Sequence, residues 1–187
     1  MKRICVYCGS SPGRVPEYGV AARELGACLA REGLELVYGG ADVGLMGELA
    51  NTVLSHGGHV IGVIPHGLAE RVGHKALSEC YVVDSMHERK TLMAELADGF
   101  IALPGGMGTL EEVFEILTWA QLGYHDKPCG LLNVQGYYDQ LLAFLAHSVE
   151  ERFVAAEHCE ILQVGSSADE LLAKLRAYIP NRREKWL

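Results

Sequence analysis

The chain has 187 residues, of which 49% are hydrophobic, and a formal net charge of −8 with a pI near 5.5. This length and apolar content suffice for a sizeable core, so we expect residues 1–187 to form a single domain. The acidic balance argues against nucleic acid bound by bulk electrostatics, although a small anion can still be held locally. The apolar stretch Ile4 to Cys8 is too short for a signal peptide or a membrane span, which favours a cytoplasmic protein.

Short apolar runs alternate with amphipathic stretches along the whole chain. We expect strands at residues 3–7, 34–38, 59–64, 80–84, 99–103, 129–134 and 160–164. We expect helices at residues 16–31, 48–56, 86–98, 110–122, 137–151 and 168–179, whereas residues 66–78 fit either a loop or a short helix. The alternation predicts an α/β fold, with a mostly parallel sheet of about seven strands covered by helices on both faces.

Glycine-rich turns follow the first, second and fifth predicted strands. They contain Gly9 and Ser10, then Gly39 and Gly40, then Gly105, Gly106 and Gly108. Parallel sheets bind ligands at the carboxyl ends of their strands, so we expect the three turns to converge on one ligand. None of them matches G-x-G-x-x-G, which favours a mononucleotide over a dinucleotide.

The third turn opens the stretch Pro104 to Glu112, which reads Pro-Gly-Gly-Met-Gly-Thr-Leu-Glu-Glu. A strand, a glycine turn and a helix together direct backbone N–H groups and a helix dipole at an anion. We expect Glu111 and Glu112 in the first helical turn, where negative charge does not help to hold phosphate and therefore indicates a second role. The alternative is a capping box, with Thr109 as N-cap and Glu112 bonding back to it.

Two basic residues, Arg89 and Lys90, stand near the start of the helix predicted at residues 86–98. The helix dipole disfavours positive charge at that end, and binding an anion would offset this cost. The alternative is that Arg89 pairs with Glu88 or Glu95 on a solvated face. This helix alone does not decide between the two interpretations.

Six cysteines and eight histidines supply no recognisable metal site. The cysteines are Cys5, Cys8, Cys28, Cys80, Cys129 and Cys159. The Cys5-x-x-Cys8 pair begins inside a predicted buried strand, and no second pair completes a zinc site. The histidines include no H-E-x-x-H sequence. We therefore expect reduced structural thiols and assign neither a metal nor a cofactor.

Taken together, these segments resemble the LOG ("lonely guy") family of cytokinin riboside 5′-monophosphate phosphoribohydrolases. The stretch 104–112 fits the signature P-G-G-x-G-T-x-x-E, and residues 86–90 fit the companion motif upstream. Residues 8–11 and 38–40 extend the resemblance, which runs from the first strand to beyond Trp119. It implies a Rossmann-like doubly wound fold, a homodimer, and hydrolysis of an N6-modified adenosine monophosphate to free base and ribose 5-phosphate.

The resemblance also implies roles for particular residues, with Arg89 and Glu112 as the catalytic pair. The residues expected to contact substrate are Gly9, Ser10, Gly39, Gly40, Glu70, Met86, Lys90, Gly105, Gly106, Met107, Gly108, Thr109, Leu110, Glu111 and Thr118. Spacing alone favours a packing role for Thr118.

Two other functions fit the same pattern. The first is a non-catalytic carrier of a nucleotide or of a molybdenum cofactor, and the second is a transferase acting on phosphorylated ribose. Members of the family often carry the label lysine decarboxylase, but no residue pattern in this chain indicates a lysine that binds pyridoxal phosphate.

Overall fold

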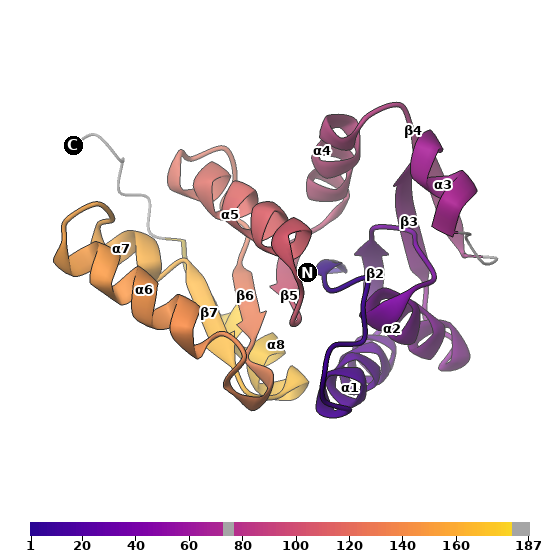
Figure 1. Ribbon diagram of the computed structural model, residues 1–187, viewed down its shortest axis with the longest axis horizontal. Helices are drawn as coiled ribbons and strands as arrows, with labels where there is room; N and C mark the ends of the chain where they lie inside the picture. Colours follow the sequence, from indigo (N-terminus) through magenta and orange to yellow (C-terminus); the bar gives the residue numbers. More distant parts are fainter. Residues whose placement is uncertain (73–76, 181–187) are drawn as a thin grey trace.

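The computed structural model describes residues 1–72 and 77–180, apart from the side chains of residues 70–72. Within this part, seven strands form one sheet in the order β4-β3-β2-β1-β5-β6-β7 (Figure 1). The strands are β1 (Arg3–Tyr7), β2 (Glu35–Tyr38), β3 (Val60–Pro65), β4 (Glu79–Val83), β5 (Gly99–Ala102), β6 (Cys129–Leu132) and β7 (Leu162–Gly165). All six pairings are parallel, which confirms the predicted α/β fold.

Helices cover both faces of the sheet. They are α1 (Glu17–Arg31), α2 (Gly44–Ser55), α3 (His66–Val72), α4 (Met86–Leu96), α5 (Met107–Gln121), the 3₁₀ turn η1 (Val134–Gly136), α6 (Asp139–Glu150), α7 (Ala156–Cys159) and α8 (Ala168–Ala177). Helices α1, α2 and α8 contribute to one hydrophobic cluster and α4 and α5 to the other, so the sheet is doubly wound (Figure 1).

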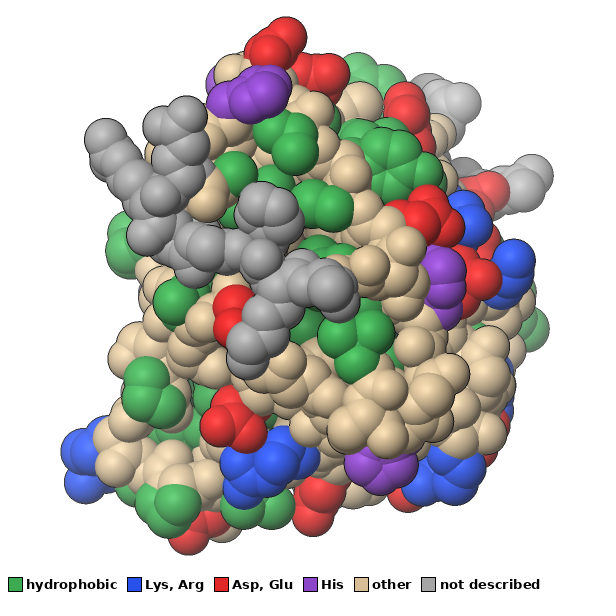
Figure 2. Space-filling view, turned by 90° about the vertical axis from the view of Figure 1, so that its right-hand side faces the viewer, with side chains coloured by type: hydrophobic (Ala, Val, Ile, Leu, Met, Phe, Trp, Pro, Cys, Tyr) green, Lys and Arg blue, Asp and Glu red, His purple; other side chains and the backbone are tan. Residues whose placement is uncertain are grey.

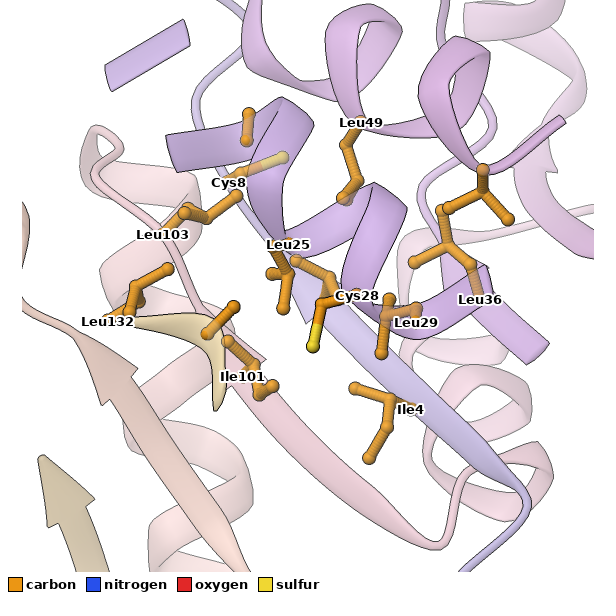
Figure 3. Packing of buried hydrophobic residues seen from close by; sticks show 14 of the residues in the cluster. Ile4, Cys8, Leu25, Cys28, Leu29, Leu36, Leu49, Ile101, Leu103 and Leu132 are labelled. Atoms are coloured by element: carbon orange, nitrogen blue, oxygen red, sulfur yellow. The ribbon is translucent and has the colours of Figure 1, made fainter. Parts of the chain in front are cut away.

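The two clusters follow from the alternation of side chains along each strand. In β1, Ile4 and Val6 belong to the cluster under α1, whereas Cys5 and Tyr7 belong to the cluster under α4 and α5. Figure 3 shows side chains of α1 packed toward Ile4 and the neighbouring strand β5. Because both faces are buried, the central strands are continuous apolar runs rather than alternating ones.

The strand order reverses between β1 and β5. The chain builds outward from β1 to β4 and then returns to the other side of β1 to continue with β5, β6 and β7. In doubly wound sheets, ligands bind outside the carboxyl ends of the strands at such a reversal. The turns after β1 and β5 lie at this point.

The segment after β3 begins with the short helix α3, one of the two predicted alternatives, and residues 73–76 of the predicted range lie outside the described residues. Three other details of the predicted elements are corrected. Helix α2 begins at Gly44 rather than after Gly47, helix α5 begins at Met107 rather than at residue 110, and the short helix α7 was not predicted. The other boundaries agree within a few residues.

The face at the β4 edge of the sheet carries a mixture of hydrophobic, acidic and basic side chains (Figure 2). Tyr81 and Val82 of the edge strand itself are exposed. Among the described residues, no helix combines the length and the apolar character needed to cross a bilayer.

Candidate active site

The three glycine turns meet at the carboxyl ends of the central strands. The backbone N–H of Gly9 donates to the carbonyl of Pro104 at 3.0 Å, and the N–H of Leu45, in α2, donates to the carbonyl of Gly9 at 3.0 Å. A cavity of about 250 Å³ lies at this junction. It is lined by Gly9, Ser10, Ser11, Gly13, Tyr18, Leu45, Pro104, Gly105, Gly106 and Tyr137. The structure therefore brings the first and third of the three predicted turns to one cavity, whereas Gly39 and Gly40 of the second turn are not among its lining residues.

The start of α5 differs from the prediction. Gly106 is the N-cap residue, with extended backbone angles (φ −93°, ψ −153°), and no side chain caps the helix. Thr109 is consequently the third residue of the helix, so the capping-box alternative is wrong. Glu111 and Glu112 lie in the second turn rather than the first, and no acidic residue occupies the first turn.

Thr109 is buried, and the lack of a side chain at Gly105, which lies against it in space, makes this possible. A Cβ atom at Gly105 would lie 2.1 Å from the Oγ1 atom of Thr109 and 2.6 Å from its Cβ atom. Because real Cβ atoms do not approach that closely, the turn of α5 fits against the loop only when position 105 is glycine. Gly106, Met107 and Gly108 are exposed at the rim, where backbone N–H groups at the start of a helix lack partners within that helix.

The buried side chains of Arg89 and Glu112 form an ion pair between α4 and α5. Nη1 of Arg89 lies 3.1 Å from Oε1 of Glu112, and each side chain is 10% exposed. Nε of Arg89 donates to the carbonyl of Val63 at 3.1 Å. Glu88 instead accepts a hydrogen bond from the N–H of Asp84 at 2.9 Å. The alternative in which Arg89 pairs on a solvated face is therefore wrong.

Gly39 makes room for the guanidinium group. A Cβ atom at this position would lie 2.0 Å from Nη2 of Arg89 and 2.7 Å from Cε of Met46. Gly40 has a φ of +78°, which favours glycine over residues with a side chain. The second turn thus contributes space for a side chain of α4, and its contact with substrate stays a prediction.

The carboxylate of Glu112 is only partly satisfied. Oε1 is buried and accepts no hydrogen bond from the residues that the structure describes, although Nη1 of Arg89 lies close. The pKa of Glu112 is raised because burial penalises the charged form; Arg89 opposes this shift, and Glu111 adds to it. Burying a charged carboxylate oxygen that accepts no hydrogen bond costs free energy, and such groups are frequent at functional sites.

Burial of polar groups is concentrated in this site. Within residues 1–72 and 77–180, the buried polar or charged side chains are those of Arg89, Thr109 and Glu112. All three belong to the two sequence motifs. Since an ion pair in the interior adds little net stability, this concentration favours a chemical role for the pair.

Lys90 joins α4 to α5 beside the buried pair. Its Nζ atom donates to Oε1 of Glu111 and, at 2.9 Å, to Oε1 of Glu115. Burial lowers the pKa of Lys90, but the hydrogen bonds that it donates to both carboxylates outweigh this effect, and the pKa is raised. Glu115 was not among the predicted site residues, and its position one turn after Glu111 is the signal that could have found it.

The remaining predicted residues lie at different distances from the pair. Met86 begins α4, and its sulfur lies 3.9 Å from Nη1 of Arg89. Leu110 packs against the hydrophobic cluster under α4 and α5. Glu70 lies in α3, and its side chain is outside the described part of the structure.

Thr118 does not lie with the other predicted residues in this chain. Its Oγ1 atom donates to the carbonyl of Phe114 at 2.6 Å. It lines a separate, largely apolar cavity of about 100 Å³ together with residues of α6 and β7, among them Leu145 and Leu162. Within one chain, the structure supports the packing role that spacing suggested.

Sequence reasoning did not identify two aromatic residues at the cavity, Tyr18 and Tyr137. Their rings meet edge to face with centroids 5.7 Å apart. Tyr18 comes from α1, and Tyr137 follows η1. The segment that contains Tyr137 follows β6, the neighbour of β5, so its place at the same edge of the sheet was the available signal.

The described residues contain no group of three or more His, Cys, Asp or Glu side chains arranged to hold a metal ion. All six cysteines are free, and both Cys5 and Cys8 are buried. Burial raises the pKa of each of these two thiols, which makes them poor nucleophiles.

The chain is similar to known proteins both in sequence and in structure. A protein-family profile described as "Possible lysine decarboxylase" matches residues 46–175. A probable cytokinin riboside 5′-monophosphate phosphoribohydrolase of Oryza sativa subsp. japonica is 52% identical over 181 residues, which are 96% of this chain and 73% of the relative. A cytokinin riboside 5′-monophosphate phosphoribohydrolase of Arabidopsis thaliana is 52% identical over 185 residues, which are 98% of this chain and 86% of the relative.

Similar solved structures include two proteins associated with the molybdenum cofactor. The molybdenum cofactor binding protein of Rippkaea orientalis has a TM-score of 0.71 at 23% identity, covering 95% of this chain and 97% of that one. The molybdenum cofactor carrier protein of Chlamydomonas reinhardtii has a TM-score of 0.70 at 22% identity, covering 94% and 96%. At this level of identity, the similarity shows a shared fold.

Proposed function

Because the chain belongs to the LOG family of cytokinin riboside 5′-monophosphate phosphoribohydrolases, we propose that it hydrolyses the N-glycosidic bond of an adenosine 5′-monophosphate, with or without an N6 substituent. The products are the free adenine-type base and ribose 5-phosphate. The observation that carries the proposal is the buried pair of Arg89 and Glu112, one turn of helix beyond a glycine loop suited to phosphate.

Glu112 carries the central role in the mechanism that we propose. As the base leaves, positive charge develops on the ribose ring, and a nearby carboxylate stabilises that charge. The same carboxylate can orient or deprotonate the attacking water. Oε1 of Glu112 accepts no hydrogen bond from any described residue and is therefore available for a substrate hydroxyl group or for water.

Arg89 orients the other participants. A guanidinium group stays protonated in proteins and is a poor proton donor, so its role is to bind rather than to protonate the departing base. It holds Glu112 through the ion pair, and the carbonyl of Val63 fixes its own position. Its location at the carboxyl ends of the strands suits a contact with the ribose or its phosphate.

The phosphate is held mainly by backbone groups. Gly105 and Gly106, together with the first N–H groups of α5, present donors and the positive end of the helix dipole. Ser10 adds a hydroxyl group from the first turn. Anchoring the phosphate fixes the anomeric carbon relative to Glu112, so binding energy contributes to orientation.

The chemistry of Lys90 does not favour a decarboxylase that uses an imine. A lysine that forms an imine needs a lowered pKa, so that the neutral amine is available. The pKa of Lys90 is raised by its two carboxylate partners, and the ammonium group is held by both. The name of the matching family profile therefore describes this site poorly.

Product analysis tests the proposed function. Purified protein is incubated with AMP and with an N6-substituted AMP, and free base and ribose 5-phosphate are separated by chromatography. We expect both products in equal amounts, at a rate proportional to protein concentration. Tight binding of nucleotide without products would instead support a carrier, and base without free ribose 5-phosphate would support a transferase.

We further propose that the chain acts as a homodimer. Helix α6 has no buried residue, and Phe144 on this helix and Phe153 after it are 63% and 87% exposed. Exposed aromatic side chains of this kind are typical of surfaces that a second chain covers. Light scattering after size exclusion should give twice the chain mass for the native protein, and Phe144→Glu with Phe153→Glu should reduce it. A native mass equal to one chain would contradict the proposal.

A further inference from the structure

Two tyrosines bind the backbone of the glycine loop from outside. The hydroxyl group of Tyr138 donates to the carbonyl of Leu103 at 2.6 Å, and that of Tyr137 donates to the carbonyl of Gly105. The carbonyl between them, of Pro104, accepts from the N–H of Gly9 at 3.0 Å. Three successive carbonyl groups are thus each held by a partner outside the loop.

Holding a carbonyl group also fixes the N–H group of the next residue. In a planar trans peptide, the C=O and N–H bonds point in opposite directions. The hydrogen bond from Tyr137 to Gly105 therefore orients the N–H of Gly106 away from Tyr137. In the same way, the hydrogen bond from the N–H of Gly9 to the carbonyl of Pro104 orients the N–H of Gly105. These are the donors of the proposed phosphate site.

The turn that presents the tyrosines is conformationally costly. Gln135 and Gly136 are consecutive residues with positive φ, at 51° and 68°. For a residue with a side chain, this conformation is unfavourable. Asn133 holds the turn closed, because its Oδ1 accepts from the N–H of Tyr138 at 2.8 Å and its Nδ2 donates to Asp139 at 2.7 Å. A strained and tightly held turn of this kind is typical of a functional element.

We propose that Tyr137 and Tyr138 are positioning residues that align the N–H groups of the glycine loop with the phosphate of a phosphorylated ribose. The inference rests on the proposed function for the identity of that ligand. Tyr138 is buried, with its ring 4.9 Å from that of Tyr137 and edge to face with it. Tyr137 lines the cavity, so removing its hydroxyl group should disturb the fold less than removing that of Tyr138.

Tyr137→Phe provides the test, because it removes one hydroxyl group and keeps the ring. The binding of ribose 5-phosphate is measured by calorimetry, which requires no turnover. We expect the dissociation constant to rise about tenfold, as for the loss of one well-placed hydrogen bond. With AMP as substrate, KM should rise and kcat should also fall, because the anchored phosphate both binds the substrate and orients its anomeric carbon. The melting temperature should remain close to that of the native protein.

Two further variants complete the design. Tyr124→Phe is the matched control, since Tyr124 is strongly exposed, and it should leave ribose 5-phosphate binding unchanged. Tyr138→Phe should weaken binding and also lower the melting temperature, because the carbonyl of Leu103 loses a buried partner. An unchanged dissociation constant in Tyr137→Phe would overturn the inference, as would a loss confined to kcat. If native protein binds ribose 5-phosphate but releases no base from AMP, the proposed function fails while the positioning role remains measurable.

Discussion

Two neighbouring ionic contacts join the same two helices, and they differ in the exposure and in the hydrogen bonding of their carboxylates. Arg89 meets Glu112, and the next residue along α4, Lys90, meets Glu111 and Glu115. Both side chains of the arginine pair are 10% exposed, whereas Glu111 is 52% exposed. Lys90 makes two hydrogen bonds to carboxylates, but the arginine contact leaves Oε1 of Glu112 without one.

We interpret the lysine contact as mainly structural and the arginine contact as mainly functional. The ammonium group of Lys90 donates to Glu111 and to Glu115, so the lysine contact has the geometry of a cross-link between the two helices. The arginine contact is supported by the carbonyl of Val63 and by the missing side chain of Gly39. Its carboxylate is held in a buried environment that raises its pKa. The chain thus retains a costly pair where the strand order reverses, which is where ligands bind.

The largest expected effect comes from breaking the arginine pair at its carboxylate. Glu112→Gln keeps the shape of the side chain and removes its charge. Turnover of AMP should fall on the order of a hundredfold or more, because charge stabilisation and activation of water are both lost. Steady-state kinetics measure the loss of turnover, and a thermal melt measures any change in stability. Near-native activity combined with a lower melting temperature would assign Glu112 to structure alone.

A smaller effect should follow from filling the space beside Arg89. Gly39→Ala places a methyl group where the guanidinium lies, and we expect kcat to fall about tenfold through misplacement of the charge. In the Arg89→Ala background the same change should have little further effect on kcat. Gly67→Ala is the matched control, since nothing lies within 4 Å of a Cβ atom at that position. Equal losses in both backgrounds would mean that Gly39 acts independently of Arg89.

The raised pKa of Glu112 predicts a shift of the acidic limb of the pH–rate profile. The proposed mechanism requires the ionised carboxylate, and burial makes ionisation harder. Activity should therefore decline on acidification at a pH above 4.5, the ordinary value for a glutamate. The dependence of kcat/KM on pH reports this ionisation in the free enzyme. A limb at or below 4.5 would show that the group controlling the rate is not a buried glutamate.

The smallest effect is expected at the lysine contact. Glu115→Gln leaves Lys90 with Glu111 as its charged partner, so activity should stay within about threefold of native. The melting temperature should fall slightly, as for a partly exposed ion pair. The informative comparison is between the activity lost in Glu115→Gln and the activity lost in Glu112→Gln. An activity loss above about tenfold at an unchanged melting temperature would show that the lysine contact takes part in catalysis.

The fold and the position of the site followed from local patterns. Alternating strands and helices predicted a parallel sheet, and the glycine turns after β1 and β5 predicted the edge at which a ligand binds. Both predictions depend on rules of sheet architecture that hold for any sequence with this alternation. The buried polar residues also lay within the motifs that the sequence made visible.

The contacts that distinguish the site were not predictable in this way. Glycines 106 and 108 suggested a turn, yet the backbone from Met107 onward is helical, because glycine permits a helix that later residues stabilise. The partner of Arg89 was undetermined, since residues 23 positions apart meet only through the packing of two helices. The hydroxyl group of Tyr137 donates to the carbonyl of Gly105, 32 residues away, and no local sequence pattern predicts such a contact.

A crystal structure of Glu112→Gln with an AMP-type nucleotide tests the central claim most directly, because the slowed variant should retain its substrate. We predict the phosphate on the N–H groups of the glycine loop and the side chain at position 112 facing the anomeric carbon. A nucleotide bound with that side chain pointing away from the anomeric carbon would contradict the account.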